Sequence, residues 1–390
     1  FDENVSGMGY NVYVTENSFV IYNVTVSNGV FYIQDDTSTT AKPNLTFTEG
    51  TLYIFIQSDS SNANNQLVLG TTSDDNSSMI NYQTIVGTPG RPGAYTSFTA
   101  TSETVSYFSF ETLGMGYEPP IIYTFTNADT PETLTMTSTK NIQYVLVAGG
   151  GSGGGGAWDG GGGGAGGVLH GTIENVQPGD YTVTIGKGGV YVYNDSNLSD
   201  GDDTTITLIN NTGNVTLTAI GGGGGGNGNG TGGSDGGSGG GNSHNGSNGV
   251  GSGTSGQGND GGIGGNTGVY HCGGGGGGAS VAGTAWGYTD GDGNGGDGVN
   301  VKDLISVYPT DLYIGGGGGG SVGMTNISQT APSALACIGG LGGGGNGYVQ
   351  LQRSSADSGI NGTGGGGGGI RGDKGDPGSG GSGIAIFYLF

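Results

Sequence analysis

The sequence predicts an all-β protein of two β-sandwich units, the second of which encloses a bundle of polyglycine II helices. Three observations support this prediction. Short apolar runs alternate with turn residues in the first 148 residues, amphipathic helical patterns of useful length are missing, and 98 of the 390 residues are glycine. Glycine costs about 1 kcal/mol per helical position relative to alanine, so we expect little α-helix.

The charge balance excludes several classes of function. The chain has 31 acidic and 8 basic residues and a net charge of −23. Nucleic acids and anionic membrane surfaces are bound by clustered Lys and Arg, which this chain lacks. A bilayer span needs roughly 18 consecutive apolar residues, and none occurs. We therefore expect no nucleic-acid partner and no membrane insertion.

Glycine is distributed unevenly, which indicates two regions. Residues 1–148 contain 10 glycines and residues 149–390 contain 88. We expect an N-terminal arm at 1–10, a first sandwich at 11–120 and a glycine-rich unit at 121–390. Because the chain begins at Phe1 without an initiator Met or a signal peptide, we interpret it as a processed chain or a fragment.

Successive strands account for the first region. Residues 19–26 and 30–34 flank Asn28-Gly29 and predict a β-hairpin. Residues 44–48 and 51–56 flank Glu49-Gly50 and predict a second one. Further strands are expected at 66–69, 95–101 and 105–110. This spacing of strands and turns is typical of an antiparallel sandwich.

The order of these segments carries a resemblance. Val-Ser-Asn-Gly-Val-Phe-Tyr-Ile, Leu-Tyr-Ile-Phe, Gly-Thr-Pro-Gly-Arg-Pro-Gly-Ala-Tyr, Tyr-Phe-Ser-Phe and Gly-Met-Gly follow one another over residues 10–117. They resemble a cupredoxin-like sandwich of extracellular and virion-associated proteins of aquatic microbes and their viruses. The resemblance implies copper ligands at Asn65, Ser109, Thr112 and Met115, of which only Met115 has a suitable side chain. A thiolate copper site needs two His and a Cys, so we expect the fold without copper and Met115 as a packed residue.

One short motif occurs twice. Gly7-Met8-Gly9-Tyr10 recurs as Gly114-Met115-Gly116-Tyr117. The repeat is a coincidence, the end of a preceding identical domain, or an arm that mimics the last strand of the domain and pairs with a neighbouring subunit. An unpaired sheet edge accepts the strand of another chain, so we take subunit pairing through residues 7–10 as a hypothesis. Intact assembly after deletion of residues 1–10 would exclude it.

The glycine-rich region has an order that a flexible linker would not need. Six-glycine blocks begin at 221, 273, 315 and 364, and short apolar strands lead into the first three. Polyglycine II is an extended helix of three residues per turn that makes no internal hydrogen bonds. Without side chains, neighbouring helices can approach closely enough to bond one another. A single run cannot offset the entropy lost on ordering, but a lattice of many runs can.

The region from Ile121 onward carries a second resemblance. The residues are 144–151, 163–168, 178–186, 217–226 and the closing Gly-Gly-Ser-Gly-Ile-Ala-Ile at 380–386. They resemble the glycine-rich domain of phage tail fibres, aquatic viral proteins and some animal receptor ectodomains. The resemblance implies a β-sandwich that frames inserted glycine helices. Residues 121–126, 133–138, 143–148, 181–185 and 384–390 would then supply the sheets.

Acidic loops offer one candidate metal site. Asp290, Asp292 and Asn294 match the first half of a calcium loop, but the twelfth position is Val301 instead of Glu. The segment is a Ca²⁺ site or a solvated turn. Asp195, Asp200, Asp202 and Asp203 form a second acidic cluster with the same two interpretations.

The cysteines suggest a disulfide rather than catalysis. Cys272 and Cys337 are the only two and both lie beside glycine runs, which favours one bridge between them. The alternative is a His271–Cys272 nucleophile pair. Because acid, base and nucleophile do not converge on a catalytic spacing, we expect no enzyme and no cofactor other than the candidate Ca²⁺.

Twelve Asn-x-Ser/Thr sequons occur, about twice the number expected by chance. In a chain secreted from a glycosylating source they predict a coat of glycans, and in a phage protein they are polar turns. They begin at Asn4, Asn23, Asn44, Asn76, Asn194, Asn197, Asn210, Asn214, Asn229, Asn245, Asn326 and Asn361.

These observations favour a non-enzymatic structural subunit of an extracellular fibre or virion appendage that assembles end to end. The alternative is a receptor-binding adhesin at a tail-fibre tip. In that case, host glycans or surface proteins would meet aromatic loops at Trp158, Tyr191–Tyr193 and Trp286–Tyr288. An enzyme on a sandwich scaffold is a distant third.

Overall fold

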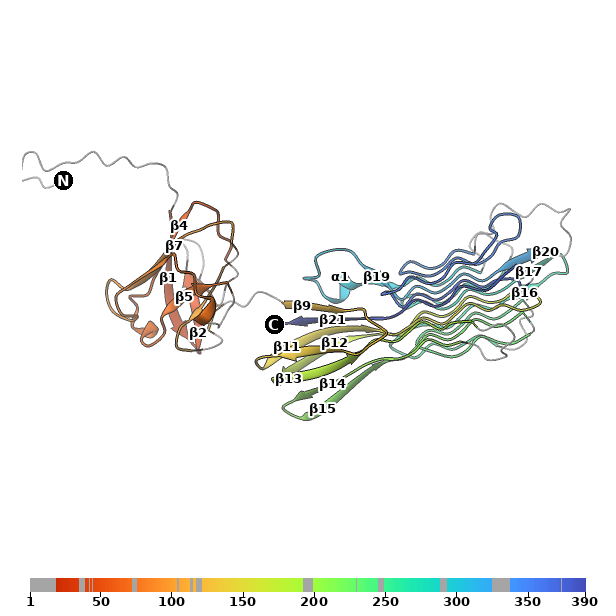
Figure 1. Cartoon of the computed structure of the whole chain (residues 1–390), viewed down its shortest axis with the longest axis horizontal. Helices are drawn as coiled ribbons and strands as arrows, with labels where there is room; N and C mark the ends of the chain where they lie inside the picture. The colour runs from red at the N-terminus through yellow and green to blue at the C-terminus, as the bar shows by residue number, and fades with distance from the viewer. Residues whose placement is uncertain are drawn as a thin grey trace, which may run out of the picture. The chain divides into compact units, whose positions relative to one another are not determined.

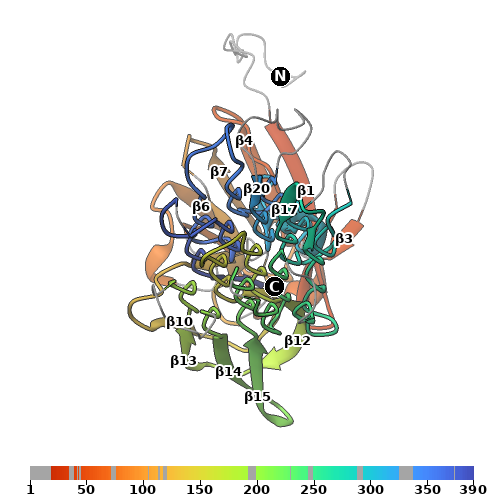
Figure 2. The ribbon, with the colours of Figure 1, turned by 90° about the vertical axis from the view of Figure 1, so that its right-hand side faces the viewer.

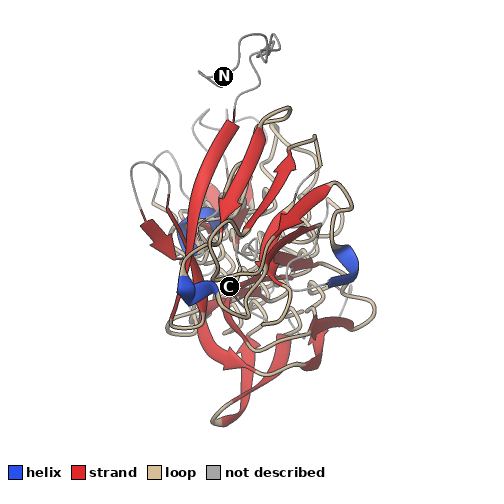
Figure 3. Ribbon diagram, turned by 90° about the vertical axis from the view of Figure 1, so that its left-hand side faces the viewer, coloured by secondary structure: helices blue, strands red, loops and turns tan. Residues whose placement is uncertain are grey.

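The computed structural model describes residues 19–34, 39–41, 43, 45–71, 76–103, 105–112, 115–116, 121–191, 199–228, 230–244, 249–287, 293–324, 337–372 and 374–390. The chain divides into two compact units, Phe1–Pro119 and Pro120–Phe390, one residue from the boundary suggested by the sequence (Figure 1). The expected N-terminal arm lies outside the described residues. Strands dominate what is described, with one four-residue α-helix and two short 3₁₀ turns at Ser60–Asn62 and Asn76–Ser78 (Figure 3).

Unit 1 contains a large sheet and a small one. The large sheet has the order β3-β2-β1-β4-β7-β6, in which only β1 and β4 are parallel neighbours. The small sheet pairs β5 with β8 in antiparallel fashion. The strands are β1 (Phe19–Ser27), β2 (Val30–Gln34), β3 (Thr39–Ala41), β4 (Leu52–Ile56), β5 (Leu67–Gly70), β6 (Gln83–Val86), β7 (Tyr95–Thr99) and β8 (Ser106–Ser109). One apolar core of buried side chains, including Phe31, Phe55, Leu67, Tyr107 and Met115, holds them together.

The first predicted hairpin is confirmed. Ser27 faces Val30 across a two-residue turn, and both turn residues have left-handed backbone angles, with φ of 50° at Asn28 and 74° at Gly29. Two successive positive φ values match the twist of flanking strands, which is why Asn-Gly favours this turn.

The second predicted hairpin is wrong. Residues 45–50 form no strand, and β4 pairs instead with β1 and β7. Phe47 turns into the core, where its ring packs edge-on against Tyr53 and Phe98 at centroid distances of 4.8 and 5.0 Å. Burial of this aromatic ring, together with the pairing of β4 along both of its edges, stabilises the observed arrangement more than a hairpin at Glu49-Gly50 would.

Unit 2 begins with a β-sandwich. One sheet has the order β10-β13-β14-β15 and the other β12-β11-β21-β9, with an apolar core from both sheets between them. The strands are β9 (Ile121–Phe125), β10 (Glu132–Met136), β11 (Lys140–Val147), β12 (Val168–Val176), β13 (Gly179–Thr184), β14 (Thr204–Asn210), β15 (Gly213–Ala219) and β21 (Ile384–Leu389). Strand segments therefore lie where the sequence suggested a frame, and β12, β14 and the first part of β15 join them without having been predicted.

A third layer covers the second sheet. The helix α1 (Val301–Leu304) and the strands β18 (Val299–Asn300) and β19 (Tyr313–Ile314) carry apolar side chains that pack on the outer face of β11 and β21. Val145, Leu146 and Val147 are consequently all fully buried. A strand buried on both faces reads as a continuous apolar run, which β11 does from Tyr144 to Val147.

The glycine runs extend away from this sandwich and lie side by side. Figure 1 shows them between the sandwich and a small sheet at their far end, and Figure 2 views them end-on. The small sheet has the order β16-β17-β20, formed by Gly265–Asn266, Tyr270–Cys272 and Val322–Met324. Among the described residues, no helix is long and apolar enough to cross a membrane.

Candidate functional site

The run 160–167 shows how the glycine region is held together. Its N–H groups donate in rotation to three neighbouring runs, 364–370, 220–226 and 274–277, over 2.8–3.1 Å. Its carbonyl groups accept from three others, 148–154, 238–241 and 318–321. The run therefore has six hydrogen-bonded neighbours, whereas a β-strand has at most two.

The rotation repeats every three residues. Along 149–154, successive N–H groups donate to the segments 199–202, 378–381 and 161–164, and then to the same three again. This is the repeat that the predicted polyglycine II geometry requires. The glycine runs form a hydrogen-bonded lattice, and the flexible-linker interpretation is wrong for them.

Glycine is required because the backbones touch. A Cβ atom built on Gly161, Gly162 or Gly164 would overlap the carbonyl oxygen of a neighbouring run. The same holds at nearly every glycine of the described runs that has ordinary backbone angles. Ala165 is an exception in the 160–167 run, and its methyl group is fully buried. Close contact with neighbouring backbones therefore requires glycine at these positions and sets the distance between the runs.

Side-chain oxygens complete the lattice at its rim. The N–H groups of Gly221 and Gly224 have no backbone acceptor there, and each donates to an aspartate Oδ1 at 2.8 Å, from Asp203 and Asp200 respectively. Both sets are three residues apart, so they match the lattice repeat. We call such a pair of oxygens facing a pair of N–H groups a rim ladder.

Two further rim ladders have the same spacing. Asn294 and Asp297 accept from the N–H groups of Ile338 and Leu341 at 2.7 and 2.8 Å. Ser358 and Asn361 accept from Ser379 and Ser382 at 3.1 and 3.0 Å. Sequence reasoning missed these ladders, although the three-residue spacing of Asp, Asn and Ser beside glycine runs was a visible signal.

The rim ladders bear on the candidate calcium sites. Asn294 Oδ1 already accepts a hydrogen bond from the Ile338 N–H. Asp290 and Asp292 lie outside the described residues. In the second acidic cluster, Asp200 and Asp203 hold lattice N–H groups, while Asp195 is outside the described residues. Within the described ranges, no group of three His, Cys, Asp or Glu side chains could hold a metal ion.

A cluster of large polar and aromatic side chains lies at the far end of the lattice. The ring of Trp158 is 5.8 Å from that of His244 and 5.2 Å from that of His271, centroid to centroid. The two imidazoles are 5.5 Å apart, and the Arg371 guanidinium lies 5.5 Å from the Trp158 ring centroid. We call these four residues the distal cluster. Each comes from the end of a different segment, so the cluster ties together the turns at this end.

Burial controls the titration of the distal cluster. It lowers the pKa of His244, and the charges of His271 and Arg371 lower that pKa further. The pKa of His271 is lowered by burial first and by Arg371 second. Both imidazoles are therefore harder to protonate than an exposed histidine. Arg371 also donates to the Met324 carbonyl at 3.3 Å, and Asp159 nearby is fully buried.

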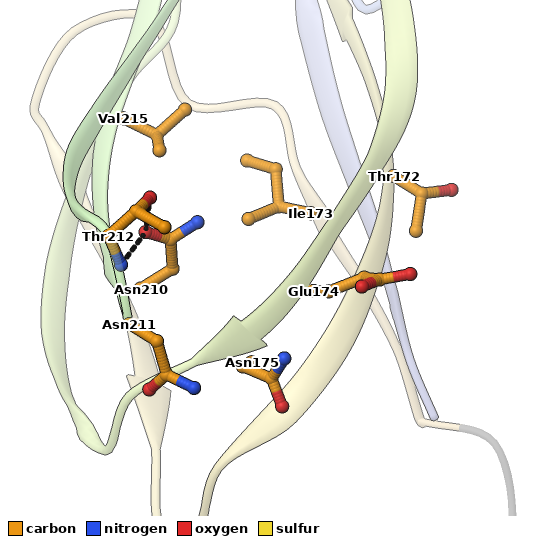
Figure 4. Close-up of a pocket in the computed structure, with 8 residues that line it drawn as sticks. All are labelled: Thr172, Ile173, Glu174, Asn175, Asn210, Asn211, Thr212 and Val215. Carbon is orange, nitrogen blue, oxygen red and sulfur yellow. Dashed lines mark hydrogen bonds between the residues drawn. The ribbon is translucent and has the colours of Figure 1, made fainter.

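A cavity lies elsewhere, in the sandwich of unit 2. It has a volume of about 330 Å³ and lies between the end of β12 and the β14–β15 turn (Figure 4). Asn210 Oδ1 accepts from the N–H and the hydroxyl of Thr212 at 2.9 and 2.7 Å. The lining offers amides, hydroxyls and one carboxylate, and no nucleophile with a base. Its residues are Thr172, Ile173, Glu174, Asn175, Asn210, Asn211, Thr212 and Val215.

Three of the four positions that correspond to copper ligands in the resemblance come together in unit 1. Thr112 Oγ1 donates to Asn65 Oδ1 at 3.0 Å, and the Thr112 N–H donates to Ser109 Oγ at 3.2 Å. Met115 is buried in the adjoining core, as expected of a packed residue. Ser109 Oγ in turn donates to Glu111 Oε2 at 3.4 Å, so hydrogen bonds occupy this corner of the sandwich.

The two cysteines are brought together but are not joined by a disulfide in the structure. Cys272 and Cys337 are both fully buried in a small apolar cluster with Val322 and Val349. The bridge predicted from the sequence is therefore not formed here, and it stays a prediction for oxidising conditions. The ring of His271 packs on Trp158 in the distal cluster.

Five sequon asparagines fall within the described residues. Asn23, Asn76, Asn214 and Asn361 are exposed, and Asn210 is half-buried at the cavity. The exposed ones lie where a glycan could be attached without displacing the core. The other seven, Asn4, Asn44, Asn194, Asn197, Asn229, Asn245 and Asn326, lie outside the described residues, as do the assembly residues Gly7, Met8, Gly9 and Tyr10.

The aromatic side chains proposed for the adhesin alternative are only partly exposed to solvent. Trp158, a member of the distal cluster, is 42% exposed. Trp286 packs against the cysteine cluster, and Tyr191 is half-buried. Val192, Tyr193 and Tyr288 lie outside the described residues.

Comparison with known proteins places the glycine-rich region in a family. No curated protein matches the chain significantly. The sequence profile of a glycine-rich domain matches residues 126–389, which is more than half of the chain and includes the glycine runs and the second sandwich except β9. The chain therefore belongs to the glycine-rich domain family.

Proposed function

We propose that this protein is a non-enzymatic structural subunit of an extracellular fibre or virion appendage, assembled end to end. The observation that carries the proposal is the lattice around residues 160–167, in which one run bonds to six others. Ordering a residue costs about 1–2 kcal/mol, and glycine is at the upper end. A chain that fixes so many glycines in one lattice has the composition of a rigid element.

Unit 1 supports the same proposal. We infer that it is a cupredoxin-like sandwich whose metal position has become a structural contact. Thr112, Asn65 and Ser109 bond to one another where the resemblance implies copper ligands. A sandwich that has kept its packing but carries no copper ligands fits a role as a spacer or joint.

The surface fits an extracellular or virion location. The net charge of −23 keeps copies soluble before assembly. Asn214 is exposed on β15, which is an edge strand of its sheet. A glycan there would block edge-to-edge pairing with other copies. Assembly would then be directed to other surfaces.

Electron microscopy of the purified chain tests the proposal. We expect filaments that lengthen as the protein concentration rises, and chains incubated with 2 M guanidinium chloride serve as the unassembled control. Discrete single particles at every concentration would contradict the proposal.

A second function, receptor binding at a fibre tip, is favoured by one observation. Trp158 keeps 42% of its surface exposed although Arg371 and two imidazoles fix its position. A fixed exposed aromatic ring suits stacking against a sugar. Loss of cell attachment in Trp158→Ala, with attachment retained in Trp286→Ala, would support this function.

A further inference from the structure

One edge of the large sheet of unit 1 is closed by the end of the unit. β3 pairs with β2 only from Tyr32 to Gln34, so β2 is left uncovered at Phe31. The Phe31 N–H donates to the Met115 carbonyl at 3.0 Å, and the Met115 side chain is 1% exposed in the core. We call this place, where β2 and the core receive Met115, the Met115 slot.

The Met115 slot accepts a specific sequence. A Cβ atom on Gly116 would overlap the carbonyl oxygen of Tyr107, so the residue after the buried methionine must be glycine. A segment that fills the slot therefore needs a long apolar side chain followed by glycine.

The arm carries this sequence a second time. Met8-Gly9 has the same neighbours, Gly7 and Tyr10, as Met115-Gly116 has in Gly114 and Tyr117. Only 10 of the first 148 residues are glycine, so the repeat does not follow from composition. Pro119-Pro120 follows the internal copy and cannot donate hydrogen bonds, whereas Asn11 to Glu16 after the arm copy alternates like a strand. The segment that follows the arm copy therefore has the stronger strand propensity of the two.

We propose that the Met115 slot is the docking site for residues 7–10 of a second copy of this chain. This inference rests on the proposed end-to-end assembly and names its joint. Exchange of an identical segment conserves the buried methionine and the Phe31 hydrogen bond, which makes it a low-cost route to association. Further pairing by residues 11–16 then favours the exchanged form.

The occupant is a second copy rather than the arm of the same chain. β1 begins at Phe19, and Val26, seven residues later, faces Phe31. To reach its own slot, the arm would have to return about 23 Å along β1 and pass around β2, at roughly 3.3 Å per residue. Residues 11–18 would then form the connection and could not pair as a strand with the sheet.

Substitutions in the full chain test the joint. We expect Met8→Ala to weaken self-association at least about tenfold, measured by sedimentation, because a buried methionine is lost. Met115→Ala keeps association, since Met8 still fills the slot, and the double variant loses it. Met79→Ala, at a half-buried methionine of unit 1 outside the repeat, is the matched control and leaves association unchanged.

A synthetic peptide of residues 4–16 provides an independent test that does not depend on how the variants fold. We expect an excess of it to block assembly of the full chain, and a Gly9→Val peptide to be at least about tenfold weaker because valine overlaps the Tyr107 carbonyl.

Assembly that neither peptide affects, or that both block equally, overturns this inference and leaves the proposed function standing. A wild-type chain that never associates defeats the proposed function itself. A monomer that the peptide cannot enter shows that Met115 is not displaced from the slot, which also overturns the inference.

Discussion

The lattice depends on the missing Cβ atom of glycine. At Gly164, a Cβ atom would overlap the carbonyl oxygen of Ser238, and moving that carbonyl would disturb the hydrogen bonds of a second run. At Gly249 there is open space around the same atom, but the backbone is left-handed with φ of 81°. The two positions separate the steric requirement for glycine from the conformational one.

Gly164→Ala is therefore expected to destabilise unit 2 more than Gly249→Ala. The exposed site should lose only the cost of a left-handed alanine, about 1–2 kcal/mol. The lattice site has ordinary backbone angles and no such cost, but it is overpacked in a backbone that cannot shift locally, which places its loss at or above the upper end of about 1–3 kcal/mol. Urea unfolding of both variants measures the difference. Equal losses would show that the runs do not touch as described.

The distal cluster makes stability depend on pH. Because the pKa values of His244 and His271 are lowered in the folded protein, the unfolded chain binds protons first as pH falls. Stability contributed by the neutral imidazoles is thus full above the ordinary histidine pKa of about 6.5 and is lost below it.

We expect the thermal unfolding midpoint to fall between pH 7.5 and 5, and to fall less in the variant with His244→Gln and His271→Gln. His170→Gln, at an exposed histidine of β12, is the control. An identical pH profile for the double variant and the wild type would contradict this role of the cluster.

At the scale of elements, the rim ladders show how the lattice ends. A run on the outside has N–H groups without a neighbouring run, and an unsatisfied N–H costs about 1–3 kcal/mol when buried. Asp200 and Asp203 supply oxygens at the lattice spacing of three residues. Acidic residues that suggested metal ligands from sequence thus have a structural role.

Removal of the aspartate rim ladder should loosen one side of the lattice. We expect Asp200→Ala with Asp203→Ala to lower the free energy of unfolding by about 1–2 kcal/mol for each lost acceptor and to speed amide exchange at Gly221 and Gly224. Asp202→Ala is the control because this residue gives the lattice its backbone carbonyl, which the substitution keeps. If the double variant matches the control, the ladder contributes nothing.

Local sequence predicted some elements and not others, for physical reasons. The Asn28-Gly29 hairpin depends on two backbone angles that these residues adopt by themselves. The predicted hairpin at 44–56 failed because the partners of β4, namely β1 and β7, come from distant parts of the chain. The distal cluster joins Trp158, His244, His271 and Arg371, whose meeting depends on the lattice register, which no local pattern encodes.

At the scale of the whole molecule, the glycine composition becomes a structural property of unit 2. The sandwich fixes where the runs begin, and the strands β11, β12, β15 and β21 lead directly into or out of them. Each run then positions the next through bonds in three directions. The order in unit 2 is therefore cooperative across the lattice, because removing one run leaves up to six others with unsatisfied groups.

Amide hydrogen exchange across residues 160–167 tests this lattice most directly. Every N–H in that run donates to a neighbouring run, so the account predicts strong protection that is lost only on cooperative unfolding of unit 2. The exposed turn at Gly249 is the internal reference for fast exchange. Exchange of residues 160–167 at the rate of that reference would contradict the lattice.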